Sequence, residues 1–175
     1  MNFTFHDEIK QLILLISFVG ILFTNNLRAL SFQDLDVTSE LADSGNDILL
    51  DQTGGLHYAE LIQGGTHHYA AITQSGAGHY LLLEQTGFGN QAWVQQQEAN
   101  NTSMLIQTGD YNRIYLDQVG NHNLADINQD GSNNSAYVDQ FGTNNIAETI
   151  QIGVGLSIIV TQYGDNNSVT VHQHD

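Results

Sequence analysis

A glutamine returns at every eleventh position over most of the 175-residue chain, and this period constrains the fold more than any other feature. The series is unbroken and comprises Gln52, Gln63, Gln74, Gln85, Gln96, Gln107, Gln118, Gln129, Gln140, Gln151, Gln162 and Gln173. A glycine stands two residues after most of them, and these glycines are Gly54, Gly65, Gly76, Gly87, Gly109, Gly120, Gly131, Gly142, Gly153 and Gly164. Glu98 interrupts the glycine series. Such self-similarity at a short period is typical of a repeat architecture.

A second polar position follows each glutamine by five residues. Asparagine occupies it at Asn90, Asn101, Asn112, Asn123, Asn134, Asn145 and Asn167. The first three repeats carry His57, His68 and His79 there, and Leu156 is a further exception. We refer to it below as the Asn position.

Between the Asn position and the next glutamine, polarity alternates as in a half-buried β-strand. Ala136 and Val138 share a face with the flanking amides Asn134 and Gln140, whereas Asp139 points the other way. The apolar face is therefore the core, and glycine supplies the positive φ that a tight turn needs. Each 11-residue unit is predicted to form one strand and one turn.

Two units make a 22-residue coil whose strands face each other across about 10 Å. Residues 46–175 are thus predicted to form an all-β fold, a β-solenoid of about six such coils with two facing parallel sheets in a cross-β, amyloid-like stack. Like residues of successive coils would stack about 4.8 Å apart, with each buried amide donating to the amide of the neighbouring coil. We therefore expect the glutamines and asparagines to form ladders in the core and the glycines to form the turns.

Residues 1–29 differ from the repeats and predict a secretory signal peptide. Lys10 precedes an apolar run at residues 12–23, which is shorter than the ~20 residues of a membrane span. We expect cleavage after Ala29, a leader segment over residues 30–45 and the solenoid over residues 46–175. The alternative for the apolar run is a buried segment of the fold.

Composition restricts the partners and the chemistry. The formal net charge is −16 with only three basic residues, which argues against a nucleic-acid partner. The chain lacks cysteine, so disulfides and thiolate metal sites are excluded, and it lacks proline, as expected for strands paired on both edges. A ladder places His57 and His79 in a line with His68 on the opposite sheet, which does not suit tetrahedral zinc. No metal, cofactor or catalytic residue is expected, because the outward acids are spread along the stack.

The repeats resemble those of the curlin family. The resemblance rests on units such as SAYVDQFGTNN at residues 135–145 and SVTVHQ at residues 168–173, and it extends over residues 46–175. It implies a structural subunit of the extracellular curli-type functional amyloid fibres of Gram-negative bacteria, which nucleates or elongates fibres used in adhesion and in the biofilm matrix. The implied partners are other copies of the chain, a companion curli subunit, an outer-membrane secretion channel and accessory factors.

Two kinds of subunit occur in such fibres, and the resemblance leans towards the minor, nucleating one. Residues 39–55 and 108–120 resemble the minor subunit, whereas residues 166–174 resemble the major one. The three histidines, Glu98 and the missing glycine-rich leader depart from the family pattern. The alternative function is a secreted β-solenoid that does not polymerise and acts as an adhesin or binds a ligand. Binding of a ligand by the three histidines or by the outward aromatic side chains is a further alternative.

Overall fold

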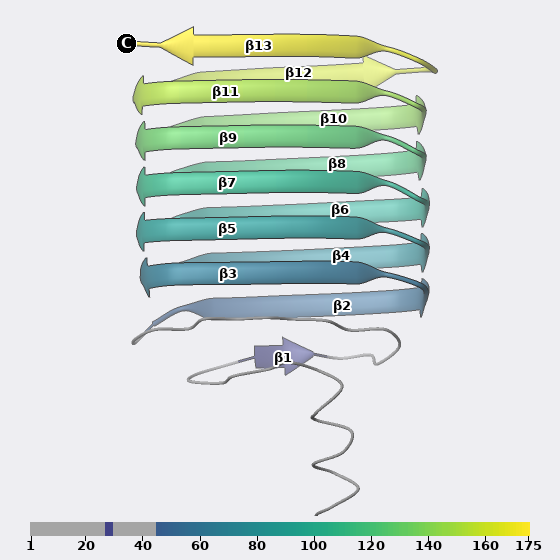
Figure 1. Cartoon of the computed structure of the whole chain (residues 1–175), viewed down its shortest axis with the longest axis horizontal. Coiled ribbons are helices and arrows are strands. Elements are labelled where there is room, and N and C mark those ends of the chain that lie inside the picture. The colour runs from purple at the N-terminus through teal and green to yellow at the C-terminus, as the bar shows by residue number, and fades with distance from the viewer. Residues whose placement is uncertain (1–26, 30–44) are drawn as a thin grey trace, which may run out of the picture.

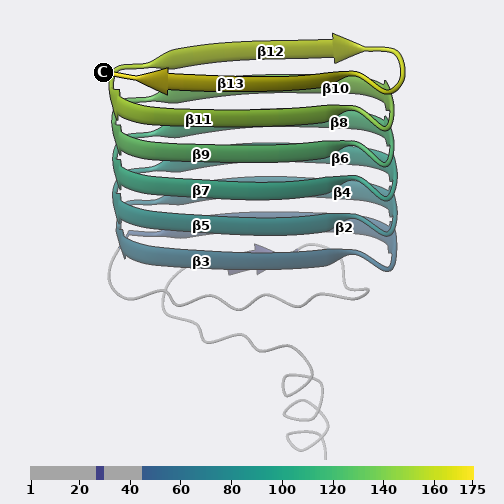
Figure 2. The same cartoon turned by 45° about the horizontal axis from the view of Figure 1, so that its top comes forward.

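The computed structural model describes residues 27–29 and 45–175, and this part of the chain consists of strands joined by short turns (Figure 1). The strands are β1 (Leu27–Ala29), β2 (Asp47–Gly55), β3 (Tyr58–Thr66), β4 (Tyr69–Ala77), β5 (Tyr80–Phe88), β6 (Gln91–Ala99), β7 (Thr102–Asp110), β8 (Arg113–Asn121), β9 (Leu124–Ser132), β10 (Ser135–Thr143), β11 (Ile146–Val154), β12 (Ser157–Tyr163) and β13 (Ser168–His174). From β2 onwards, consecutive strands alternate between two facing sheets (Figure 2). One sheet has the order β1-β2-β4-β6-β8-β10-β12, and the other has the order β13-β11-β9-β7-β5-β3.

The strands from β2 to β13 pair in parallel at a constant step of 22 residues. Gln140 of β10 lies beside Gln162 of β12, and Gln151 of β11 lies beside Gln173 of β13. A slip of one residue would turn every apolar side chain towards solvent, so alternation holds this register. The prediction of a β-solenoid of six 22-residue coils with two parallel sheets is confirmed. We number the coils from β2–β3 (coil 1) to β12–β13 (coil 6).

The core lies between the two sheets and is built from small and branched side chains. Ala125, Ile127 and Val138 have no exposed surface. Most parallel sheets are covered on both faces and read as continuous apolar runs. Here the outer faces are open, and burial alternates along each strand, as in β10. The alternation in the sequence therefore identifies the inner face.

The corners differ from the predicted glycine turns. Strand pairing continues through the glycines, and Gly120, with φ of 122°, is the penultimate residue of β8. A Cβ there would collide with the carbonyl oxygen of Gly142 in the next coil, so glycine is required for close approach of two backbones. The chain reverses two residues later, at a left-handed residue just before the Asn position. These left-handed residues are Leu56, His67, Gly78, Gly89, Asn100, Tyr111, His122, Asn133, Asn144, Gly155 and Asn166.

The N-terminal edge of the solenoid carries a short additional strand. β1 pairs in parallel with β2, and Leu27 lies beside Ile48 and Ala29 beside Leu50. β1 falls at the end of the predicted signal peptide, whereas residues 1–26 and 30–44 lie outside the described residues. The cleavage site and the leader segment stay predictions. No helix in the described part is both long and apolar enough to cross a membrane.

Candidate functional site

Two glutamine ladders run through the core, one along each sheet. In each ladder, Nε2 of one glutamine donates to Oε1 of the glutamine one coil further on, at 2.5–3.1 Å. The second hydrogen of the amide reaches a backbone carbonyl across the core, as from Gln118 to Thr102 O at 3.1 Å. The ladder glutamines from Gln52 to Gln162 are buried, and Gln173 at the C-terminal edge is half-buried. Ten of the amides thus bond both along and across the solenoid.

The asparagines form a different kind of ladder. Oδ1 of Asn101 accepts the backbone N–H of Asn123 at 3.0 Å, while its Nδ2 donates to the carbonyls of Gln97 (2.7 Å) and Gly120 (2.9 Å). The expected amide-to-amide bond is therefore wrong for most of this series, and only Asn167 donates to the amide of Asn145. The asparagine side chain is one bond shorter than that of glutamine and sits at the corner, where backbone groups of two coils are within its reach.

The three histidines occupy the Asn position and reproduce two of the three hydrogen bonds of Asn101. All three are buried. Nε2 of His79 lies 3.1 Å from Ser75 O, and its Nδ1 lies 3.2 Å from the backbone nitrogen of Asn101. The carbonyl needs a donor and the N–H needs an acceptor, so the ring is neutral with its hydrogen on Nε2. Residues 27–29 and 45–175 contain no group of three or more metal-ligating side chains.

The ends of the glutamine ladders are chemically complementary. Oε1 of Gln52 and Oε1 of Gln63, in coil 1, are buried and accept no hydrogen bond. At the other end of the described coils, Gln162 and Gln173 donate across the core to Ile146 O and Ser157 O, and no described residue accepts their second hydrogen. Two buried acceptors thus lie at one end and two free donors at the other. A buried carbonyl without a donor costs on the order of 1–3 kcal/mol.

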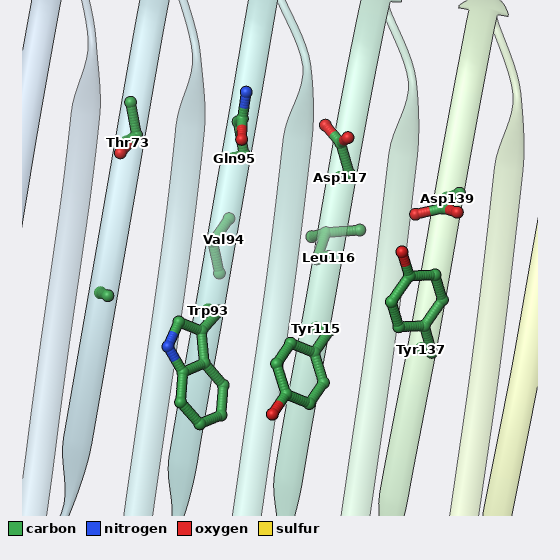
Figure 3. A pocket seen from close by; sticks show the side chains of 10 residues that line it. Thr73, Trp93, Val94, Gln95, Tyr115, Leu116, Asp117, Tyr137 and Asp139 are labelled. Carbon is green, nitrogen blue, oxygen red and sulfur yellow. The ribbon is translucent and has the colours of Figure 1, made fainter.

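The outer face of the first sheet carries a column of aromatic rings beside a column of polar groups (Figure 3). Trp93 and Tyr115 are stacked, with ring centroids 4.5 Å apart and an interplanar angle of 2°. A shallow groove of about 270 Å³ follows these rings and passes Asp117 and Asp139. Burial, and then the charge of Asp139, raises the pKa of Asp117. Tyr137 continues the column less closely, with its ring centroid 6.1 Å from that of Tyr115 and an interplanar angle of 34°.

The fold defines a class of protein, the parallel two-sheet β-solenoid with ladders of buried amides in its core. In the described residues, β12 and β13 each have an unpaired edge. The family comparison agrees with this class. The model of the curlin associated repeat matches residues 44–76, 99–131, 120–153 and 142–174. These segments span more than half of the chain, which therefore belongs to the curlin repeat family, the family of curli-type fibre subunits. No curated protein and no solved structure matches the chain.

Residues 77–98 of the repeat region lie outside these matches. They contain His79 and Glu98, two departures from the repeat pattern, and both lie at the boundary of the second and third coils. Glu98, with φ of 75°, stands where the other repeats have the glycine that follows the glutamine by two residues. This boundary is chemically unlike the later ones.

Proposed function

We propose that the chain is a structural subunit of an extracellular curli-type fibre and that copies join head to tail, with coil 6 of one copy against coil 1 of the next. The observation that carries this proposal is the pairing of buried acceptors at Gln52 and Gln63 with free donors at Gln162 and Gln173. A monomer leaves the two acceptors unsatisfied, whereas a second copy in register satisfies both. A head-to-tail contact of this kind does not close on itself and produces a filament.

The step of 22 residues sets the register of the joint. Carrying it past the C-terminal edge places Gln162 on Gln52 of the next copy and Gln173 on Gln63 of the next copy. Asn167 then meets the backbone N–H of His57 in the next copy. Leu156 is the exception, because its apolar side chain cannot accept the backbone N–H of the next copy at the fourth corner. The joint would thus reproduce three of the four side-chain rungs of an internal coil boundary.

Core packing and charge favour the same register. Val169 and Val171 are only partly buried at the open edge, and the next copy would cover them with Ala59 and Leu61. On the outer face, Asp51 of the next copy would lie beside Thr161, so the joint places no carboxylates side by side. Internal boundaries do so, as at Asp117 and Asp139. The joint would therefore add no repulsion of this kind to that already present in the solenoid.

The short strand β1 competes with this docking. It pairs with residues 48–50 of β2, the edge that the preceding copy would use. Cleavage after Ala29 would remove β1 and open the edge. Export and assembly would thereby be coupled.

The wider role follows from the family. Curlin repeats and a β-solenoid without a clustered catalytic centre in its described part support a structural protein rather than an enzyme. We propose that the chain is secreted, lies in fibres at the cell surface and contributes to adhesion and to the biofilm matrix. Its partners would be other copies, a companion curli subunit and the secretion channel with its accessory factors. We favour the minor, nucleating role, and a trace of the chain should then shorten the lag of a major curli subunit.

Engineered disulfides test the joint, since the natural chain has no cysteine. Asp51→Cys with Thr161→Cys places two outward thiols about 4.8 Å apart across the joint, within the range for a disulfide. Mild oxidation should give a covalent ladder of oligomers on a non-reducing gel. The matched control, Thr73→Cys with Thr161→Cys, is one coil out of register at about 10 Å and should stay monomeric. Electron microscopy showing only dispersed monomers would favour the non-polymerising adhesin, and fibres that cross-link equally in both variants would disprove the register.

A further inference from the structure

The boundaries between coils differ in the chemistry at their two corners. From coil 3 to coil 5, asparagine Oδ1 accepts the backbone N–H of the next coil at every corner, at 2.9–3.1 Å. Between coils 2 and 3, both acceptors are imidazoles. Asn90 N–H donates to Nδ1 of His68 and Asn101 N–H donates to Nδ1 of His79, each at 3.2 Å. We call this boundary the histidine seam.

An imidazole differs from an amide because it can gain a proton in the pH range of natural environments. In the neutral ring, Nδ1 is the acceptor, and a proton there would face a backbone N–H. The hydrogen bond would be replaced by two opposed donors in a buried corner. An asparagine cannot make this change. The histidine seam is therefore the one boundary in coils 1–6 whose two corner bonds are both conditional on pH.

From these contacts we propose that the histidine seam is a pH-operated latch, in which protonation of His68 and His79 separates coils 1 and 2 from the rest of the solenoid. Coil 1 carries the acceptors Gln52 and Gln63, so acid would withdraw the docking face on which the preceding copy assembles. The docking consequence rests on the proposed fibre function. The opening of the seam does not, because it is a property of the folded chain.

The groups around the two rings oppose their protonation. Burial lowers the pKa of His68 from its ordinary value of 6.5, and His67 lowers it further, while the backbone carbonyls of Gly64 and Gly87 and the charge of Asp110 act in the opposite direction. Burial lowers the pKa of His79 as well, with a further contribution from His57 and opposition from the carbonyl of Ser75.

The sign of the pH effect follows from these directions. Because the folded chain binds protons less readily than the unfolded chain at both rings, their stabilising effect is complete above about pH 6.5 and declines below it. His57 and His79 stack with ring centroids 5.0 Å apart, so two imidazolium charges there would repel each other. Acid therefore acts on the seam through lost hydrogen bonds and through added charge.

The backbone at the same boundary adds to its weakness. Glu98 in coil 3 stands opposite Gly76 in coil 2, in the column that glycine otherwise occupies. Its φ of 75° is unfavourable for a residue with a side chain. The histidine corners and the strained backbone of Glu98 both lie between coils 2 and 3, so we expect this boundary to be the least stable one.

Hydrogen exchange followed by mass spectrometry tests the latch on protein folded at pH 7.5, whether fibrous or monomeric. After correction for intrinsic rates, a change from pH 7.5 to pH 5.5 should accelerate exchange by about tenfold in peptides from residues 47–101. Peptides from residues 113–154 should be unaffected. The His68→Asn/His79→Asn chain, which installs the rung of the later coils, should lose this acceleration. The control His122→Asn/His172→Asn, at two exposed histidines, should retain it.

An even loss of protection over all six coils, or equal acceleration in the His68→Asn/His79→Asn chain, would overturn the latch. A second measurement needs no variant. Imidazole NMR signals of the natural chain should show His68 and His79 titrating below the ordinary histidine pKa of 6.5, with the loss of coil 1–2 signals following the same curve. Titration of both rings at or above the ordinary value would also overturn it. Failure to form fibres would count against the proposed function alone.

Discussion

The side-chain Nε2 of Gln140 donates to Oε1 of Gln162 at 2.8 Å, one coil further along the solenoid. Replacing Gln140 with alanine removes that bond and the bond that Gln140 accepts from Gln118, leaving buried groups unpaired. We expect the free energy of unfolding to fall by about 1–3 kcal/mol and fibre growth to slow. Gln162→Ala should cost less in the isolated chain, because this residue has a ladder partner on one side only. Denaturant unfolding and growth rates measure both effects.

Thr161 is the control for this comparison, since it is exposed and adjacent to Gln162 in the same strand. Thr161→Ala removes no buried amide and should change the stability by less than about 0.5 kcal/mol. If all three variants behaved alike, the glutamine ladders would not contribute to stability.

Repulsion between Asp117 and Asp139, which lie side by side on β8 and β10, should slow assembly at neutral pH. Burial, and then the charge of Asp139, raises the pKa of Asp117, so the ionisation of Asp117 opposes folding. The contribution of Asp117 to stability is therefore greatest at low pH and is lost as pH rises through its folded pKa. We expect added salt at pH 7.5 to shorten the lag of fibre formation. A pH change from 7.5 to 5 should do the same in the His68→Asn/His79→Asn background, where the latch is absent. Thioflavin fluorescence measures the lag.

Asp117→Asn should weaken this dependence, because one charge of the pair is gone, while the similar pair of Asp126 and Glu148 remains. Asp130→Asn removes the same charge beside Thr108 and Ile152 and should retain the dependence. A lag at pH 7.5 and low salt as short as that at pH 5 in the same background would mean that charge does not limit assembly.

The coil and its register could be predicted because they depend on side chains that recur at fixed intervals in the sequence, the glutamine at every eleventh position and the apolar residue at every second position of a strand. Alternation identified the inner face, and the recurrence of a buried amide required stacking at a step of two units. The curlin resemblance pointed to the same fold, which the structure and the family match confirm. The prediction was weaker at the corners. Tyr111 occupies a left-handed position there with φ of 59°, which its residue type does not suggest.

The asparagine series illustrates a second limit. Asn101 and Gln96 carry the same amide, and the period alone does not distinguish their bonding. Their different bonds arise from the distance between the amide and the backbone, which depends on where each residue lies in the turn. The replacement of asparagine by His68 and His79 is visible in the sequence. Their hydrogen bonds to two backbone groups were not predicted, for the same reason.

Glu98→Gly should stabilise the solenoid. Glu98 has φ of 75° in a column of glycines, and glycine adopts this conformation without the steric cost of a side chain. We expect a gain of about 1 kcal/mol in the free energy of unfolding, located at the boundary of coils 2 and 3. Thermal unfolding and hydrogen exchange of residues 69–99 measure it. Glu84→Gly removes the same charge from an ordinary strand position and should destabilise the fold, so a similar gain from both variants would point to charge rather than backbone strain.

A peptide covering residues 155–164 should assemble by itself. It contains β12, whose segment Ser157–Gln162 has four β-branched residues in a row and no charge, and Ile159 on its outer face is 76 % exposed. High β-propensity without charge is typical of segments that form cross-β stacks, whereas most other strands carry an acid that opposes stacking. The matched control covers residues 133–142, the same positions one coil earlier, and includes Asp139. Thioflavin fluorescence and electron microscopy at equal concentrations should show fibres from the first peptide well before the second. If peptide 155–164 stayed soluble and unstructured for days, β12 would not be the strand of the solenoid that assembles most readily.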